Sequence, residues 1–107
     1  MPQIPVTLSA GDLNVLVRNQ AFLNLPSMQK YARLLQKPTS GCKQCWAKER
    51  VRSLYPTLLL ELASMAKSRE CSKLYQVLLQ QYNVPTGSVF RVVTATSTVI
   101  FNDKGSV

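Results

Sequence analysis

The spacing of apolar residues changes once along this 107-residue chain, and that change sets the expected fold class. Up to Tyr82 the apolar residues recur every three or four positions, which is the period of an amphipathic helix. After the turn-forming stretch 85–88 the chain becomes rich in β-branched and aromatic residues, which favour strands. We therefore predict one α+β domain over 1–107 in which helices dominate. It has a helical body over about 9–83 and a C-terminal β segment over about 88–101.

Start and stop signals divide the helical body into about five short helices. Ser9, with Asp12 three residues later, is typical of a helix N-terminus, and Pro26 suits the first turn of the next helix. Pro56 is expected to end a third helix, which begins near Cys42, and to open a fourth. A fifth helix follows a polar join at 67–70. The densest apolar face, and the expected centre of the core, belongs to the fourth helix: Leu58, Leu59, Leu62, Met65 and Ala66.

Extended chain is expected at both ends. Pro5 limits the N-terminal segment 4–8 to the edge of a sheet, where it could pair with the C-terminal strands. The segments 89–94 and 98–101 are strand-like, and the stretch between them is either a hairpin tip or part of one long strand. Two strands alone are only marginally stable, so they need the helices or a neighbouring molecule. We expect the helical body to fold without the chain that follows Thr94.

Positive charge is concentrated in the middle of the chain. The sequence holds 13 Lys and Arg, 5 Asp and Glu and no His, for a formal net charge of +8. Between residues 30 and 52, seven cations are opposed by Glu49 alone. Such a surplus favours a negative partner, either nucleic acid or an acidic protein surface. The candidate binding residues are Lys30, Arg33, Lys37, Lys43, Lys48, Arg50 and Arg52.

Cys42 and Cys45 form the one short motif that suggests a site. A structural zinc ion needs about four ligands, and the chain offers Cys42, Cys45 and Cys71 with no His. A redox pair of this spacing normally follows a strand, whereas Gly41 precedes it here. We therefore expect no cofactor and no metal and interpret the pair as small thiols beside Trp46. Zinc at Cys42, Cys45 and Cys71 is the weaker alternative.

Enzymatic function is not expected. Histidine, the commonest proton-transfer residue, is absent, the five carboxylates form no obvious pair, and the four glycines are too scattered for a phosphate loop. The longest apolar run is 58–60, far short of a membrane span, and no secretory signal is recognisable. The odd cysteine count also argues for reduced thiols. We expect a protein of the cytoplasm or of a virion, without membrane association.

Two kinds of binding function remain. The first is a structural protein, such as a virion component or another subunit of a complex, which docks through its terminal strands and a basic helical face. The second is a free nucleic-acid-binding or regulatory protein that uses the segment 30–52. Its cations are scattered around the helices, which suits phosphate contact better than base reading. Under the first hypothesis the residues expected to dock against other subunits are Val89, Phe90, Val92, Val99 and Phe101.

Overall fold

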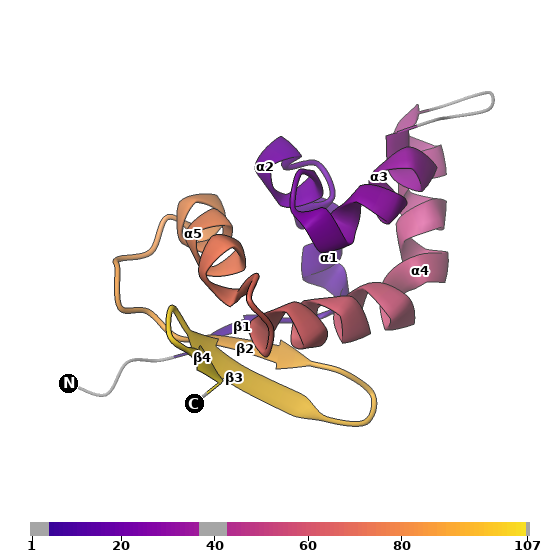
Figure 1. Cartoon of the computed structure of the whole chain (residues 1–107). Helices are drawn as coiled ribbons and strands as arrows, with labels where there is room; N and C mark the ends of the chain where they lie inside the picture. Colours follow the sequence, from indigo (N-terminus) through magenta and orange to yellow (C-terminus); the bar gives the residue numbers. More distant parts are fainter. Residues whose placement is uncertain (1–4, 37–42, 107) are drawn as a thin grey trace.

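The computed structural model describes residues 5–36 and 43–106 (Figure 1). Helices dominate the described ranges, and the α+β class predicted from the sequence is confirmed. The elements in chain order are β1 (Val6–Leu8), η1 (Ala10–Asp12), α1 (Leu13–Leu16), α2 (Gln20–Leu23), η2 (Pro26–Met28), α3 (Gln29–Gln36), α4 (Lys43–Ala66), α5 (Cys71–Tyr82), β2 (Phe90–Val93), β3 (Thr98–Asn102) and β4 (Gly105–Ser106), where η denotes a 3-10 helix.

The strands form one sheet in the order β1-β2-β3-β4, so the two ends of the chain share it. β1 runs parallel to β2, with Val6 opposite Phe90, and occupies an edge, as Pro5 predicted. β2 and β3 are antiparallel and form a hairpin, in which the N–H of Thr94 donates to the carbonyl of Ser97 at 2.8 Å. The hairpin, and not one long strand, is therefore the correct alternative for residues 88–101.

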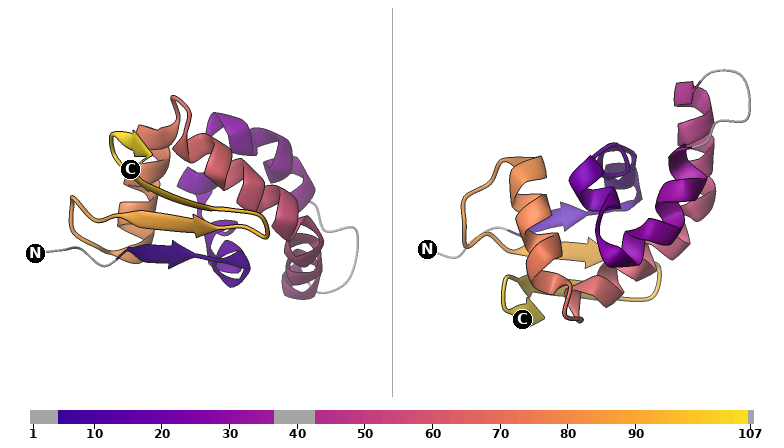
Figure 2. Two further views of the ribbon diagram at one scale, coloured as in Figure 1. Left: turned by 90° about the horizontal axis from the view of Figure 1, so that it is seen from below. Right: turned by 45° about the horizontal axis from the view of Figure 1, so that its top comes forward.

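The helices cover one face of this sheet, and the other face is open among the described elements (Figure 2, left). Because side chains alternate along a strand, Phe90 and Val92 of β2 point into the core, whereas Arg91 between them is exposed. In β3, Phe101 is buried and Ile100 stays 38% exposed. The sheet is thus half-buried, with an apolar inner face and a mixed outer face.

α5 holds the inner face of the hairpin in place through an aromatic cluster. The ring of Tyr75 meets Phe90 edge-on, with centroids 5.6 Å apart, and Phe90 stacks on Phe101 at 5.9 Å. The hydroxyl of Tyr75 also donates to the carbonyl of Ser88 at 2.7 Å and accepts from the N–H of Gly87 at 2.9 Å. One side chain therefore fixes both the packing of β2 and the turn that precedes it.

The N-terminal helical region begins as predicted but is divided differently. The carboxylate of Asp12 accepts from the N–H of Ser9 at 2.8 Å, and Leu13 and Leu16 after it are fully buried. α1 then ends at Leu16, and the side chain of Asn19 caps a separate short helix, α2, by accepting from the N–H groups of residues 21 and 22. Asparagine favours this cap because its side-chain oxygen replaces a missing helical acceptor.

The predicted break at Pro56 is wrong, because α4 is one 24-residue helix with Pro56 inside it. Proline has no N–H for the carbonyl of Arg52, and its ring crowds the preceding turn, so it bends a helix that does not end. The two halves of α4 run in different directions in Figure 1. Both halves are held by the core, since Val51 and Leu58 on either side of the bend are buried.

The expected centre of the core is confirmed. The predicted face of α4 is buried from Leu58 to Ala66, and α5 buries Leu74, Tyr75 and Leu78 against it. The described buried apolar side chains form one contiguous cluster that includes β1, the short helices and the hairpin. Among the described helices, none has the length and apolar character needed to cross a bilayer.

Candidate anion-binding surface

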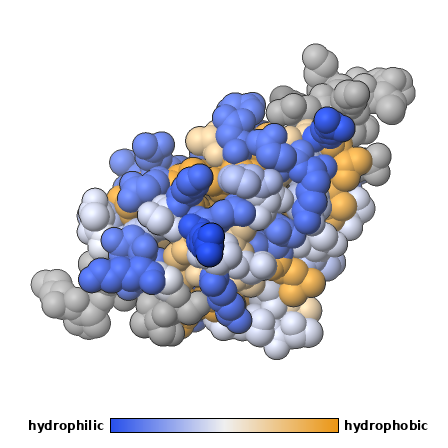
Figure 3. All heavy atoms as spheres, in the orientation of Figure 1, coloured by the Kyte–Doolittle hydropathy of each residue, from blue (hydrophilic) through white to orange (hydrophobic). Residues whose placement is uncertain are grey.

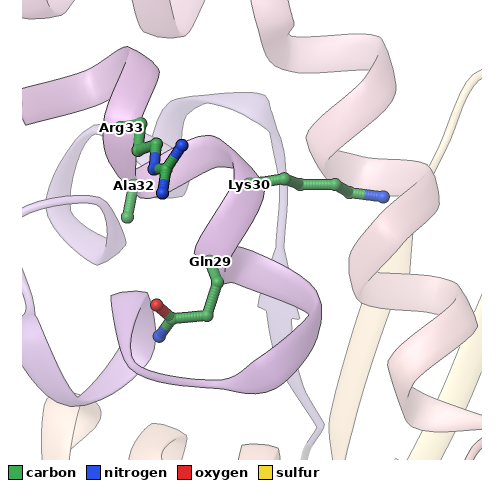
Figure 4. A pocket seen from close by; sticks show the side chains of 4 residues that line it. All are labelled: Gln29, Lys30, Ala32 and Arg33. Atoms are coloured by element: carbon green, nitrogen blue, oxygen red, sulfur yellow. The ribbon is translucent and has the colours of Figure 1, made fainter.

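Lys30 and Arg33, the first two predicted binding residues, are both exposed on α3. Together with Gln29 and Ala32 they line a surface hollow of about 480 Å³ among the described residues. Figure 4 shows the side chains diverging: Lys30 extends toward α4, whereas Arg33 lies on the other side of α3. The two cations therefore do not form one continuous row on α3.

Lys30 is partly neutralised by the fold. Its ammonium lies 3.3 Å from the Glu61 carboxylate on α4 and 5.2 Å from the centroid of the Tyr31 ring. The hydrogen bond and the charge of Glu61 raise the pKa of Lys30, and burial followed by Glu61 raises the pKa of Tyr31. Lys30 thus helps to join α3 to α4, and a partner would have to share it with Glu61.

Arg33 and Arg52 have no such restraint. Both are exposed, and neither has an ion pair or hydrogen bond within the part of the chain that the structure describes. The side chains of four other predicted cations lie outside the described residues: Lys37, Lys43, Lys48 and Arg50.

A second group of cations, absent from the predicted binding residues, lies where α4 meets α5; two of them fall in the polar join predicted at 67–70. Lys67, Arg69 and Lys73 are all exposed there. Glu70 sits among them, but its carboxylate accepts hydrogen bonds from the N–H and the hydroxyl of Ser27. Lys30 follows Ser27 by three residues, so this contact brings the second group close to the start of α3. We call the combined set the basic surface: Lys30, Arg33, Lys67, Arg69 and Lys73.

Hydrophilic side chains cover much of the molecular face that contains α3 and α5 (Figure 3). Three of the five carboxylates are used inside the fold: Asp12 bonds Ser9, Glu61 pairs with Lys30, and Glu70 holds Ser27. The remaining acids, Glu49 and Asp103, are exposed. The cations are therefore more available to a partner than the acids are. Ser27 and Glu70 are 43 residues apart, so no sequence pattern indicated that this acid would be bonded within the fold.

The residues predicted to dock against other subunits have a different role. Phe90, Val92 and Phe101 are fully buried and Val99 is 5% exposed, while Val89 is half-buried. Their side chains fill the core of their own chain, because α4 and α5 cover the inner face of the hairpin. The two edge strands are also only three and two residues long, which makes them poor templates for strand addition.

Of the three cysteines, Cys71 is the one whose side chain the structure describes. Cys71 is buried, its thiol donates to the carbonyl of Asn102 at 3.1 Å, and burial raises its pKa. The thiol is therefore held in its neutral, unreactive form. Cys42 and Cys45 lie outside the residues whose side chains are described, and the described part of the chain holds no group of three metal-ligating side chains. The predicted zinc alternative at Cys42, Cys45 and Cys71 therefore falls largely outside the described residues.

The described tyrosines do not form a stacking surface for bases. Tyr31 and Tyr75 are buried, and the hydroxyl of Tyr55 accepts from the side-chain amide of Asn14 at 2.8 Å. Comparison with protein-family models, with curated proteins and with solved structures finds no match to this chain. The residues themselves are thus the basis for a functional proposal.

Proposed function

We propose that the protein is a non-enzymatic component of a multi-subunit assembly, such as a virion, and contacts nucleic-acid phosphates through the basic surface. The observation that carries the proposal is the contrast between bonded acids and free cations. Glu61 and Glu70 are held by intramolecular partners, whereas Arg33, Arg69 and Lys73 extend from the surface without any in the described chain. Lysine and arginine in this state can replace the counterions that surround nucleic-acid phosphates.

The contacts expected are to phosphates and not to base edges. The cations come from α3 and from the α4–α5 turn, and Lys30 and Arg33 diverge, so they do not form one row that fits a groove. The buried aromatic rings leave no described platform for base stacking. Binding should therefore depend strongly on salt and weakly on sequence.

The test compares two charge-matched double variants of the full chain on a mixed-sequence DNA duplex. Arg33→Ala with Arg69→Ala removes two cations from the basic surface. Arg91→Ala with Lys104→Ala removes the same charge from the outer sheet face and the β3–β4 turn. Five or six phosphate contacts give a slope of about −5 for the logarithm of affinity against that of salt. The first pair should make this slope shallower by about 2, and the second should leave it unchanged.

Equal slopes for both pairs would show that only net charge matters and would refute the basic surface. Native mass measurement with and without the duplex addresses assembly separately. The proposal expects discrete oligomers of the chain alone or on DNA. A monomer in both conditions favours the free regulatory alternative.

A further inference from the structure

A small apolar pocket opens at the bend of α4, and its described lining includes no residue of the basic surface. Its volume is about 250 Å³, and its walls come from η1, from the middle of α4 and from the tip of the β2–β3 hairpin. None of the described residues that line it is charged. They are Ala10, Tyr55, Pro56, Leu59, Leu60, Thr94, Ala95 and Thr96.

Leu60 gives this pocket an apolar rim. It is 55% exposed, although Leu59 before it and Leu62 after it are buried. Single exposed leucines are common on proteins. Here the exposed leucine borders a preformed apolar hollow, so one partner group could remove both from water at once. Removal of such adjoining apolar surface from water is the main favourable contribution at the centre of protein interfaces.

Arg52 adds a positive charge beside the pocket. It precedes Tyr55 and Pro56 by three and four residues, and residues at these spacings are neighbours on a helix surface. Its guanidinium is exposed and has no ion pair in the described part of the chain. Its carbonyl also lacks its helical donor, because Pro56 has no N–H. An apolar pocket, a free cation and a backbone acceptor thus occur along one stretch of α4, from Arg52 to Leu60.

We propose that this site docks an acidic segment of a partner protein, which inserts one large apolar side chain into the pocket and places a carboxylate beside Arg52. The volume lies below the roughly 300–1,000 Å³ usual for small-molecule sites, so a single anchoring side chain fits it better than a whole cofactor. The acidic character follows from charge complementarity with Arg52 and with a chain of net charge +8. This inference does not depend on nucleic-acid binding, since none of its residues belongs to the basic surface.

The probe is a displayed library of random dodecapeptides, selected against the immobilised full chain. The expected consensus has one large apolar residue with Asp or Glu within a few positions. A selected peptide is then synthesised and its affinity measured by fluorescence anisotropy. A library that gives no enrichment, or a consensus without acidic residues, overturns the proposal.

Matched variants locate the peptide. Leu60→Asp should weaken binding by at least about tenfold, and Arg52→Glu by about fivefold or more. The controls make the same changes on α3: Leu34, which is 45% exposed, to Asp, and Arg33 to Glu. Each control should change the affinity less than about twofold, within the range of energetically neutral positions. Stronger effects from the controls would place the peptide on α3 and refute the site.

Two further measurements keep the result interpretable. If thermal unfolding shows that Leu60→Asp does not fold, Ala95→Trp at the exposed hairpin tip blocks the pocket instead and should cause the same loss of peptide binding. DNA affinity of a folded Leu60→Asp variant should fall only slightly, in keeping with its added charge. Peptide binding can thus fail while DNA binding stands, or the reverse, so the two proposals are tested separately.

Discussion

The carboxylate of Glu70 accepts two hydrogen bonds from Ser27, 43 residues earlier in the chain, one from its hydroxyl and one from its backbone N–H at 3.2 Å. This contact joins the α4–α5 turn to η2 just before α3 begins. It also uses the one acid in a run that is otherwise basic from Lys67 to Lys73. The same pair therefore stabilises the fold and shapes the basic surface.

A double-mutant cycle on this pair should show coupling. Ser27→Ala removes the hydroxyl hydrogen bond to the half-buried carboxylate and leaves the backbone one, whereas Glu70→Ala removes both. The cycle therefore measures the bond between the two side chains. We expect a coupling of about 1 kcal/mol in the free energy of unfolding, measured by urea denaturation. Ser72→Ala, at an exposed position on α5, is the control and should change stability by less than about 0.5 kcal/mol. Strictly additive effects would mean that the contact contributes no net stability.

Tyr82→Phe is expected to stabilise the protein by about 1 kcal/mol near pH 7, because it removes a buried polar group that lacks a hydrogen bond. Within the described chain the buried hydroxyl of Tyr82 has no partner, although its ring packs beside Phe90. Burial, and then the charge and proximity of Asp12, raise the pKa of this hydroxyl, but Tyr82 and Asp12 do not reach the geometry of a full hydrogen bond. Urea denaturation measures the change, and a loss of stability would point to a partner for the hydroxyl.

Tyr82→Phe should also change how the free energy of unfolding depends on alkaline pH. Burial first and Asp12 second raise the pKa of Tyr82 in the folded chain. Above about pH 10 the unfolded chain loses the phenolic proton while the folded chain keeps it, so stability falls as the pH rises. The contribution of the protonated Tyr82 phenol to the free energy of unfolding is fully present below about pH 10 and is lost above it. The wild type should therefore lose more stability than Tyr82→Phe between pH 9 and 11. Lys30 and Cys71 titrate in both proteins, so the difference isolates Tyr82.

Truncation after Thr94 is expected to unfold the whole chain. The sequence suggested that the helical body would survive, but Val99 and Phe101 are part of its core and their loss also uncovers Phe90. Each such side chain contributes about 1.5–3 kcal/mol, a large part of the usual stability of a small domain. Circular dichroism with thermal denaturation should show no cooperative transition. A chain that ends after Asp103 loses β4 but keeps β2 and β3, and it should still unfold in a cooperative transition.

Local sequence predicted the elements better than their contacts. The helical face of α5 and the strand character of β2 and β3 were recognisable because burial on one side imposes a fixed spacing of apolar residues. The helix break predicted at Pro56 was wrong because proline disfavours a helix only locally. The buried residues on both sides of it keep α4 continuous. The sequence could not show whether the apolar strand face packs on its own helices or on a partner, because the pattern is the same in both cases. This applies to Phe90, Val92, Val99 and Phe101.

The succession of a helical body and a C-terminal β segment, the excess of positive charge and the lack of histidine were determined by the sequence alone. Each depends on residue identity or on neighbours a few positions away. Tertiary structure decided which cations remain free, where the apolar pocket opens and which strand residues form the core. These depend on pairs such as Ser27 and Glu70, or Ala10 and Leu60, that are distant along the chain. Their proximity arises only when the whole core closes, because no local interaction encodes it.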